Sequence, residues 1–237
     1  MVGSAEHSAP PFLHLMKIQK IILRAFLFIS LGLSTALVHA QDRAATATLT
    51  TVTGPSAVVL FEGKSTPASV GLKVAQGAVI MTGPDSQVSI QVHDGIAAVV
   101  AARSHIEVEK LSVSPNGTRN ALLNLKEGNL AASLDPARKS ENNFGIRTAK
   151  GIAMARGTTL TVSVNGNNYT VSVVSGTVTV NWGGQVVSIV GSSSASVTSS
   201  GGGQVTTTSL SAAMTAGGST GLTEALTAAA AAVATVA

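Results

Sequence analysis

Residues 144–182 read FGIRTAKGIAMARGTTLTVSVNGNNYTVSVVSGTVTVNW, with apolar and polar residues alternating over most of their length. A period of two places successive side chains on opposite faces of a β-strand. Asn165-Gly166-Asn167 and Ser175-Gly176 interrupt the alternation, and glycine there supplies the positive φ that a tight hairpin turn needs. We therefore expect an antiparallel meander with one apolar face. The side chains expected to be buried on this face are those of Val162, Val171, Val173, Val178, Val180 and Trp182.

Three short motifs stand out in this stretch. They are Ile146-Arg147-Thr148 followed by Lys150-Gly151, then Ala155-Arg156-Gly157-Thr158, and finally Val174-Ser175-Gly176-Thr177-Val178. Together with upstream elements at Gly77–Thr82, Asp94-Gly95 and Ser104–Val108, they resemble the FecR domain over roughly Gly54 to Ile189. The resemblance implies an exported domain that takes part in sensing or protein–protein signalling. It also marks a set of motif residues with a structural or partner-binding role, namely Arg147, Thr148, Arg156, Gly157, Thr158 and Gly176.

The N-terminal segment has the organisation of a signal peptide. Basic residues between Lys17 and Arg24 precede an apolar run of about 14 residues, shorter than the roughly 20 that span a bilayer. Val38-His39-Ala40 fits the small-residue rule of signal peptidase, so we expect cleavage between Ala40 and Gln41. Met16 is an alternative start. We therefore expect an exported protein, periplasmic or at the cell surface, with no membrane span after cleavage.

Charge gives no reason to expect a nucleic-acid partner, and the composition indicates how the fold is stabilised. Of 15 basic and 11 acidic residues, the expected leader contains three and one, which leaves a net charge of +2. A nearly neutral domain has no electrostatic attraction for nucleic acid. The chain has no cysteine, so disulfides contribute nothing and a packed core must supply the stability.

Further short strands are predicted between residues 56 and 134, with turn residues between them. The apolar pattern around Gly128, which includes Leu123, Leu125 and Leu130, recurs 48 residues later around Gly176. One such unit is marginal alone, so the units must stack or pair to bury a common face. We expect an all-β fold, either β-solenoid-like or a rolled β-sandwich of short antiparallel hairpins, with hairpin turns at Glu127-Gly128 and Ser175-Gly176.

Composition divides the chain into four segments. Residues 1–40 form the signal peptide, 41–53 a lead-in that is either flexible or a first edge strand, 54–190 the FecR-like domain, and 191–237 a Ser/Gly/Thr/Ala-rich tail. The first part of the tail is typical of a flexible linker or one last weak strand. Its Leu222–Ala234 stretch is rich enough in alanine for a short helix, which would be marginal in isolation.

One predicted strand carries potential metal ligands. His105, Glu107 and Glu109 alternate with apolar residues, so their side chains project from the same face. Residues i and i+4 of a strand lie about 13 Å apart, so the three cannot share one ion without help from another strand. We therefore favour a solvated polar face and expect no metal.

No catalytic constellation is recognisable. The sequence has no Gly-x-Ser-x-Gly elbow, no cysteine nucleophile and no Walker or dinucleotide-binding glycine motif. His93 and Asp94 are adjacent and so point apart on a strand, and Asp94-Gly95 is better explained as a hairpin turn. We expect a non-enzymatic protein without a cofactor.

Arg147 and Arg156 have two interpretations. In the first, they form an exposed pair that binds an anionic ligand or a partner. In the second, Arg156 folds over the strand edge and donates to loop carbonyls, while Gly157 permits a close backbone approach. We favour the structural interpretation, because the glycine and threonine beside Arg156 are typical of turns.

The resemblance also frames the expected function. Regulators of this family usually carry a cytoplasmic anti-sigma region and a membrane helix ahead of the periplasmic domain. At most about 20 residues precede the apolar run here, too few for a folded cytoplasmic domain. We therefore expect a stand-alone exported FecR-domain protein with a protein partner in the cell envelope. The alternative is a cell-surface structural or adhesive β protein, which the uncharged Ser/Thr/Gly-rich tail favours.

Overall fold

The computed structural model describes residues 41–182, 184–191, 193–198 and 205–209. The expected signal peptide with Ala40, and the expected helix at Leu222–Ala234, lie outside these residues. Among the described residues, no helix has both the length and the apolar character required to cross a membrane.

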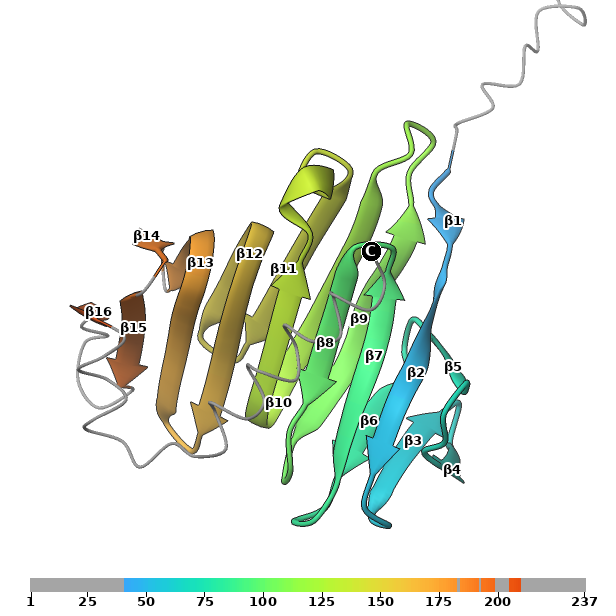
Figure 1. Cartoon of the computed structure of the whole chain (residues 1–237). Helices are drawn as coiled ribbons and strands as arrows, with labels where there is room; N and C mark the ends of the chain where they lie inside the picture. The colour runs from blue at the N-terminus through green and yellow to red at the C-terminus, as the bar shows by residue number, and fades with distance from the viewer. Residues whose placement is uncertain (1–40, 183, 192, 199–204, 210–237) are drawn as a thin grey trace, which may run out of the picture. The chain divides into compact units, whose positions relative to one another are not determined.

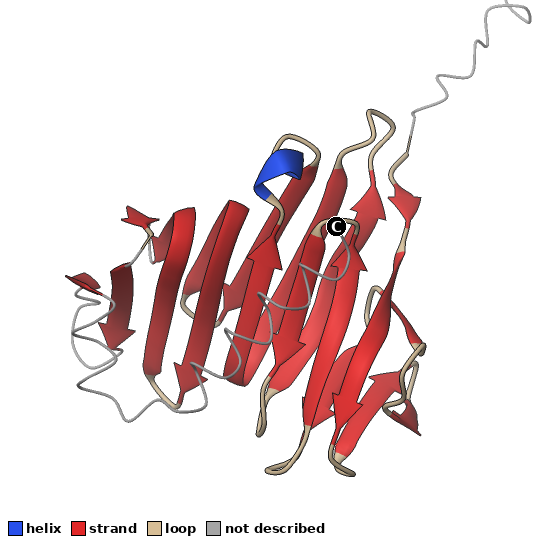
Figure 2. Cartoon of the chain, in the orientation of Figure 1, coloured by secondary structure: helices blue, strands red, loops and turns tan. Residues whose placement is uncertain are grey.

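The described chain is almost entirely β-structure (Figures 1 and 2). This confirms the expected fold class. The strands are β1 (Arg43–Ala44), β2 (Thr46–Thr53), β3 (Ala57–Phe61), β4 (Lys64–Pro67), β5 (Lys73–Ala75), β6 (Val79–Thr82), β7 (Gln87–His93), β8 (Ile96–Val100), β9 (His105–Val113), β10 (Arg119–Leu134), β11 (Asn142–Thr148), β12 (Gly151–Asn165), β13 (Asn168–Trp182), β14 (Gln185–Val190), β15 (Ser193–Thr198) and β16 (Val205–Ser209).

A short 3₁₀ turn, η1 (Pro136–Arg138), joins β10 to β11. Asp135 caps it, because its Oδ1 accepts a hydrogen bond from the Ala137 N–H at 2.8 Å. Proline at the first position fits the cap, since its missing N–H has no partner to lose there. The turn brings the chain back beside the start of β10, where the Arg119 N–H donates to the Glu141 carbonyl at 2.8 Å.

The described strands belong to one hydrogen-bonded, mixed sheet. β7 and β8 are antiparallel and meet at the Asp94-Gly95 turn, and β12 and β13 are antiparallel and meet at Asn165–Asn168. Both turns agree with the sequence-based expectation. β10 and β11, however, are parallel over residues 119–124 and 142–147. An arrangement of antiparallel hairpins alone is therefore wrong at this point, because η1 returns the chain without reversing the strand direction.

The hairpins expected at Glu127-Gly128 and Ser175-Gly176 do not form. β10 and β13 continue through these residues as single strands. Gly128 has a φ of 89° and Gly176 a φ of 81°, and Gly157 in β12 has a φ of 62°. A residue with positive φ inside a strand produces a bulge and a bend rather than a reversal. The pairing register shifts accordingly between Leu125 and Glu127.

Each bend gives a strand new neighbours. Ahead of Gly128, β10 pairs with β9 and β11, and beyond it β10 pairs with β8 and β12. β12 likewise pairs with β11 ahead of Gly157 and with β10 beyond it. In Figure 1, β7 and β8 lie in front of β6 and β9, and the bent strands connect the two layers. The sheet is therefore folded onto itself around its apolar side chains.

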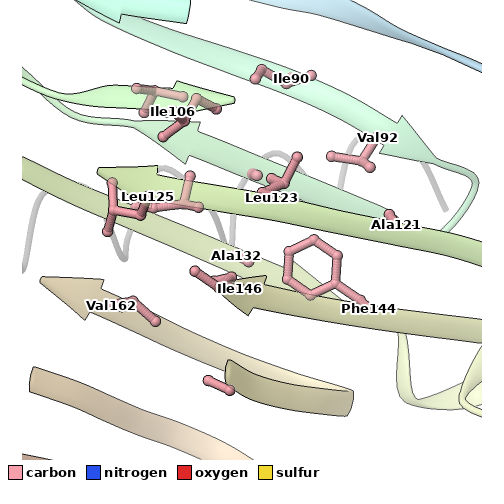
Figure 3. Packing of buried hydrophobic residues seen from close by; sticks show 14 of the residues in the cluster. Ile90, Val92, Ile106, Ala121, Leu123, Leu125, Ala132, Phe144, Ile146 and Val162 are labelled. Carbon is pink, nitrogen blue, oxygen red and sulfur yellow. The ribbon is translucent and has the colours of Figure 1, made fainter. Parts of the chain in front are cut away.

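The apolar side chains of the alternating strands form one large core. Figure 3 shows Phe144 and Ile146 of β11 lying among Leu123, Val92 and Ala132. Every inward position expected from the alternation is buried, which confirms the assignment of the strand faces. These positions are Leu123, Leu125, Leu130, Val162, Val171, Val173, Val178, Val180 and Trp182.

The sheet extends beyond the expected limits of the domain. β2 pairs with β5 and β7, so the lead-in at residues 41–53 contributes a strand. β15 pairs with β13 and β16 within the segment expected to be a linker or one weak strand. Strands at both ends, β2 and β15–β16, therefore pair with the domain expected at residues 54–190.

Candidate functional site

A small apolar surface lies on the outer side of β10, β11 and β12. It is formed where one residue from each of these strands lies beside its cross-strand neighbour. These cross-strand partners are Leu122, Gly145 and Met154. Gly145 has no side chain, and a Cβ at its position would lie 2.7 Å from the Met154 Sδ and 3.0 Å from the Leu122 Cδ1. The two apolar side chains therefore meet over the glycine. Met154 is 37% exposed, so this surface is accessible.

Arg147 lies two residues from Gly145 and so on the same face of β11. Its Nε donates to both carboxylate oxygens of Glu109, at 2.7 and 2.9 Å. The arginine side chain is 40% exposed and the glutamate side chain 31%. A partly exposed pair contributes little to stability, but it holds the guanidinium in one orientation beside the apolar surface.

Arg156 lies two residues from Met154, on the same outer face of β12. Its side chain is exposed, and within the described residues it makes no hydrogen bond and no ion pair. Among the described residues, therefore, Arg156 makes none of the hydrogen bonds to loop carbonyls that we favour from the sequence. The bend at Gly157 follows Arg156, so Arg156 itself is still part of the outer face of β12.

The remaining motif residues have structural surroundings. A Cβ at Gly157 would lie 2.9 Å from the Pro136 Cα, so the glycine lets β12 approach η1. A Cβ at Gly176 would lie 2.6 Å from the Cγ2 of Thr158, whose side chain is buried. Thr148 accepts a hydrogen bond from the Lys150 N–H at 3.3 Å and so closes the β11–β12 turn. The motif thus contains two outward arginines and four residues that shape the bends and the turn.

A groove of about 370 Å³ borders the apolar surface through Leu122 and Glu109. Asp42 forms part of its wall, where its carboxylate accepts from the Ser114 Oγ at 2.7 Å and the Ser112 Oγ at 3.0 Å. These hydrogen bonds, with Lys110 at 3.3 Å, hold the pKa of Asp42 below its usual range. The groove is therefore lined by charges that already have partners in the chain.

The acidic residues of β9 are also paired with cations. Glu107 lies 3.3 Å from Lys126, and Glu109 binds Arg147. His105 stands two residues from Glu107 and is half-buried. Among the described residues, no group of three His, Cys, Asp or Glu side chains is placed to hold a metal ion.

His93 is buried at the end of β7. Its Nε2 lies 3.3 Å from the Asn120 carbonyl oxygen on β10. Burial lowers the pKa of His93, and Arg119 acts in the same direction, while the hydrogen bond to Asn120 and the charge of Asp94 oppose this shift. The neutral imidazole thus connects two strands and has a structural position.

Sequence reasoning missed Leu122 and Met154, which lie between the two arginines. The available signal is Gly145, a glycine inside a predicted strand, which marks a place where neighbouring atoms approach closely. The side chains that approach Gly145 are determined by how β10, β11 and β12 pair. This pairing cannot be read from a local sequence pattern.

Comparisons with known proteins identify the domain type. The family model described as "FecR protein" matches residues 78–179, which confirms the resemblance in the sequence. No curated protein matches the chain. Two crystal structures of a candidate anti-sigma factor from Parabacteroides distasonis are similar to it, with 17% and 16% identity and TM-scores of 0.48 and 0.47. Each similarity covers 55% of this chain and 59% of the solved chain, so less than two thirds of that protein's length is matched.

Proposed function

Residues 78–179 carry a FecR domain, and from this premise we propose that the chain is an exported, non-enzymatic protein that binds a protein partner in the cell envelope. Its role is in sensing or signalling, as the domain type suggests. The observation that carries the proposal is the exposed Arg156 beside Met154, since this arginine has no partner among the described residues. Arginine and methionine are enriched at protein interfaces, where a few such residues contribute most of the binding energy.

The proposed contact surface consists of Leu122, Met154, Arg147 and Arg156. The apolar pair in its centre loses water when a partner binds, and the two guanidinium groups at its sides select an acidic or carbonyl-rich partner surface. Glu109 orients Arg147, so one of the two cations is preorganised before binding. A partner with an apolar side chain flanked by carboxylates fits this arrangement.

The test is site-specific crosslinking in cells that export the full chain. A photoreactive amino acid replaces Met154, and captured proteins are identified with and without the second change Arg156→Glu. We expect one envelope protein to be captured and the charge reversal to abolish its capture. Lys64→Glu is the matched control, because Lys64 is an exposed cation on β4 outside the contact surface. Equal capture by both charge-reversal variants would contradict the proposed surface, and capture of glycans only would favour the adhesive alternative.

Export rests on the leader sequence. Cleavage after Ala40 leaves Gln41 as the N-terminus, next to Asp42, whose carboxylate is bound by Ser112 and Ser114 on and beside β9. The new N-terminus would therefore be tied to the sheet. Sequencing of the secreted protein should start at Gln41, and a retained leader in the membrane fraction would instead mean an anchored protein.

The finer architecture is best described as a rolled β-sandwich. Support comes from the bends at Gly128, Gly157 and Gly176, which pass β10, β12 and β13 from one set of neighbours to another. A solenoid would instead need regular coils of similar length, whereas the repeated units are unevenly spaced. A crystal structure with continuous parallel coils would contradict this description.

A further inference from the structure

The two layers of the sheet end near each other, at β4 and β5. From β10, one branch of the sheet runs through β8, β7 and β2 to β5, and the other runs through β9, β6 and β3 to β4. The bend in β10 joins the two branches at one end. At the other end β4 continues into β5 through residues 68–72, at the right-hand edge of the sheet in Figure 1. This edge is therefore where the apolar interior between the layers can open to solvent.

A pocket of about 220 Å³ lies at this edge and is lined by residues of both branches. Val59, Val74 and Ala78 in its wall are buried members of the main core. Phe61 also lines it but is 37% exposed, and a Cβ at Gly77 would lie 3.9 Å from the Cε2 of its ring. The pocket thus combines buried apolar walls with an accessible aromatic ring. The other lining residues are Thr46, Lys64, Thr66, Leu72, Lys73 and Ala75.

Two lysines border this pocket, one from each branch of the sheet. Lys64 on β4 is the cross-strand partner of Phe61 on β3, so both side chains project from the same face. Lys73 lines the pocket from β5. Both lysines are exposed, and within the described residues neither forms an ion pair, in contrast to Lys110 and Lys126. The lining contains no acidic residue, so the pocket has a positively charged rim.

We propose that this pocket binds an amphiphile with one apolar chain and an anionic head group, such as a medium-chain carboxylate. The chain inserts between the layers against Val59, Phe61 and Val74, where burial of its apolar surface favours binding. The head group stays at the rim beside the ammonium groups of Lys64 and Lys73, whose aliphatic stems cover apolar surface. The volume is below the roughly 300–1,000 Å³ of most small-molecule sites, so a single short chain fits and a nucleotide does not.

The natural absence of cysteine allows a single thiol to report occupancy of the pocket. Thr66→Cys places this thiol in the pocket wall on β4, and Val186→Cys is the reference, since Val186 is 66% exposed on β14. The rate of reaction with a maleimide is measured in the full chain as decanoate is added below its micelle concentration. Decanoate at about ten times its dissociation constant should slow Thr66→Cys about tenfold and leave Val186→Cys unchanged. If Thr66→Cys does not fold, Ala75→Cys on β5 reports from the other branch.

Decanol tests the role of charge, because it has the same chain without the carboxylate. Half-maximal protection should need at least about fivefold more decanol than decanoate. Changing Lys64 and Lys73 to Gln together should bring the two concentrations within about twofold. The matched control changes Lys139 and Lys150, two exposed lysines outside the pocket, and should leave the difference intact. Absence of protection, equal protection by decanol and decanoate, or a difference that survives the Lys64 and Lys73 changes would overturn the proposal.

A free amphiphile and a membrane lipid offer the same chemistry, and vesicles distinguish them. Protection of Thr66→Cys by decanoate but not by phosphatidylglycerol vesicles would assign the pocket to free amphiphiles. Protection by these vesicles as well, but not by neutral phosphatidylcholine vesicles, would assign it to anionic lipid, and both results support the proposal. Equal protection by the two kinds of vesicle would overturn it. The pocket shares no residue with the proposed contact surface, so crosslinking at Met154 and protection at Thr66 can fail independently.

Discussion

The two halves of β10 and β12 belong to the same strands but present different outer surfaces. On the side of β9 and β11, the outer side chains are large, and the charged Glu109, Arg147 and Arg156 accompany the apolar Met154. On the side of β7 and β8, they are small, uncharged and buried, as with Val99 and Ala131. The inner side chains of both halves are alike and share one core. The difference shows that the outer side chains change in character at the bends while the packing inside is continuous.

Glycine is what makes this division possible. At Gly128 the strand has a φ of 89°, and a Cβ there would lie 2.5 Å from the Arg103 carbonyl oxygen and 2.6 Å from the Ser104 Cα. Both are atoms of the backbone and cannot rotate away as the end of a side chain can. The bend in β10 therefore depends on both the positive φ and the missing side chain.

The largest effect should follow from filling this bend. Gly128→Ala should lower the free energy of unfolding by at least about 3 kcal/mol, because it adds a backbone clash to the cost of a positive φ. Gly63→Ala is the matched control. Gly63 has a φ of 77° but no atom within 4 Å of the added Cβ, so its loss should be about 1 kcal/mol. Urea unfolding of both variants measures the difference, and equal losses would show that close approach does not define the bend.

A smaller effect is expected from His93, which connects the two layers through the Asn120 carbonyl. Burial lowers its pKa in the folded protein below the ordinary 6.5. The unfolded chain then binds more protons, so stability is complete above about pH 6.5 and falls as the pH drops below that value. Thermal melting between about pH 7.5 and about pH 5.5 should show this fall, and it should be weaker in His93→Gln. An identical pH dependence in the variant would assign the effect to other groups.

The inner faces of the strands could be predicted from sequence because their alternation is local. Val171 and Val173 are buried because the period of two places both on the inner face of their strand. The bends could not be predicted, because Gly128 and Gly176 fit a hairpin turn and a bulged strand equally well. The choice is made by distant atoms, such as the Arg103 carbonyl beside Gly128.

The proposed contact surface was predictable only in part. The motif identifies Arg147 and Arg156, but the favoured structural role of Arg156 assumes a turn next to it, and β12 continues there. The pairing of Arg147 with Glu109 joins residues 38 positions apart and depends on the order β9–β10–β11. Leu122 and Met154 meet because the pairing registers of β10 with β11 and of β11 with β12 place both beside Gly145, a relation that no local pattern contains.

The smallest effects on stability should come from Arg147 and Arg156, the two arginines of the proposed contact surface. Measuring these effects distinguishes the structural from the partner-binding interpretation of the motif. Arg156→Ala should change the free energy of unfolding by less than about 0.5 kcal/mol, because the side chain is exposed. Arg147→Ala should cost up to about 1 kcal/mol, since it removes a partly exposed ion pair with Glu109. In Glu109→Ala the same arginine change should then cost almost nothing, as a double-mutant cycle by urea unfolding can measure. A loss above about 1 kcal/mol for Arg156→Ala would restore the structural interpretation and remove Arg156 from the contact surface.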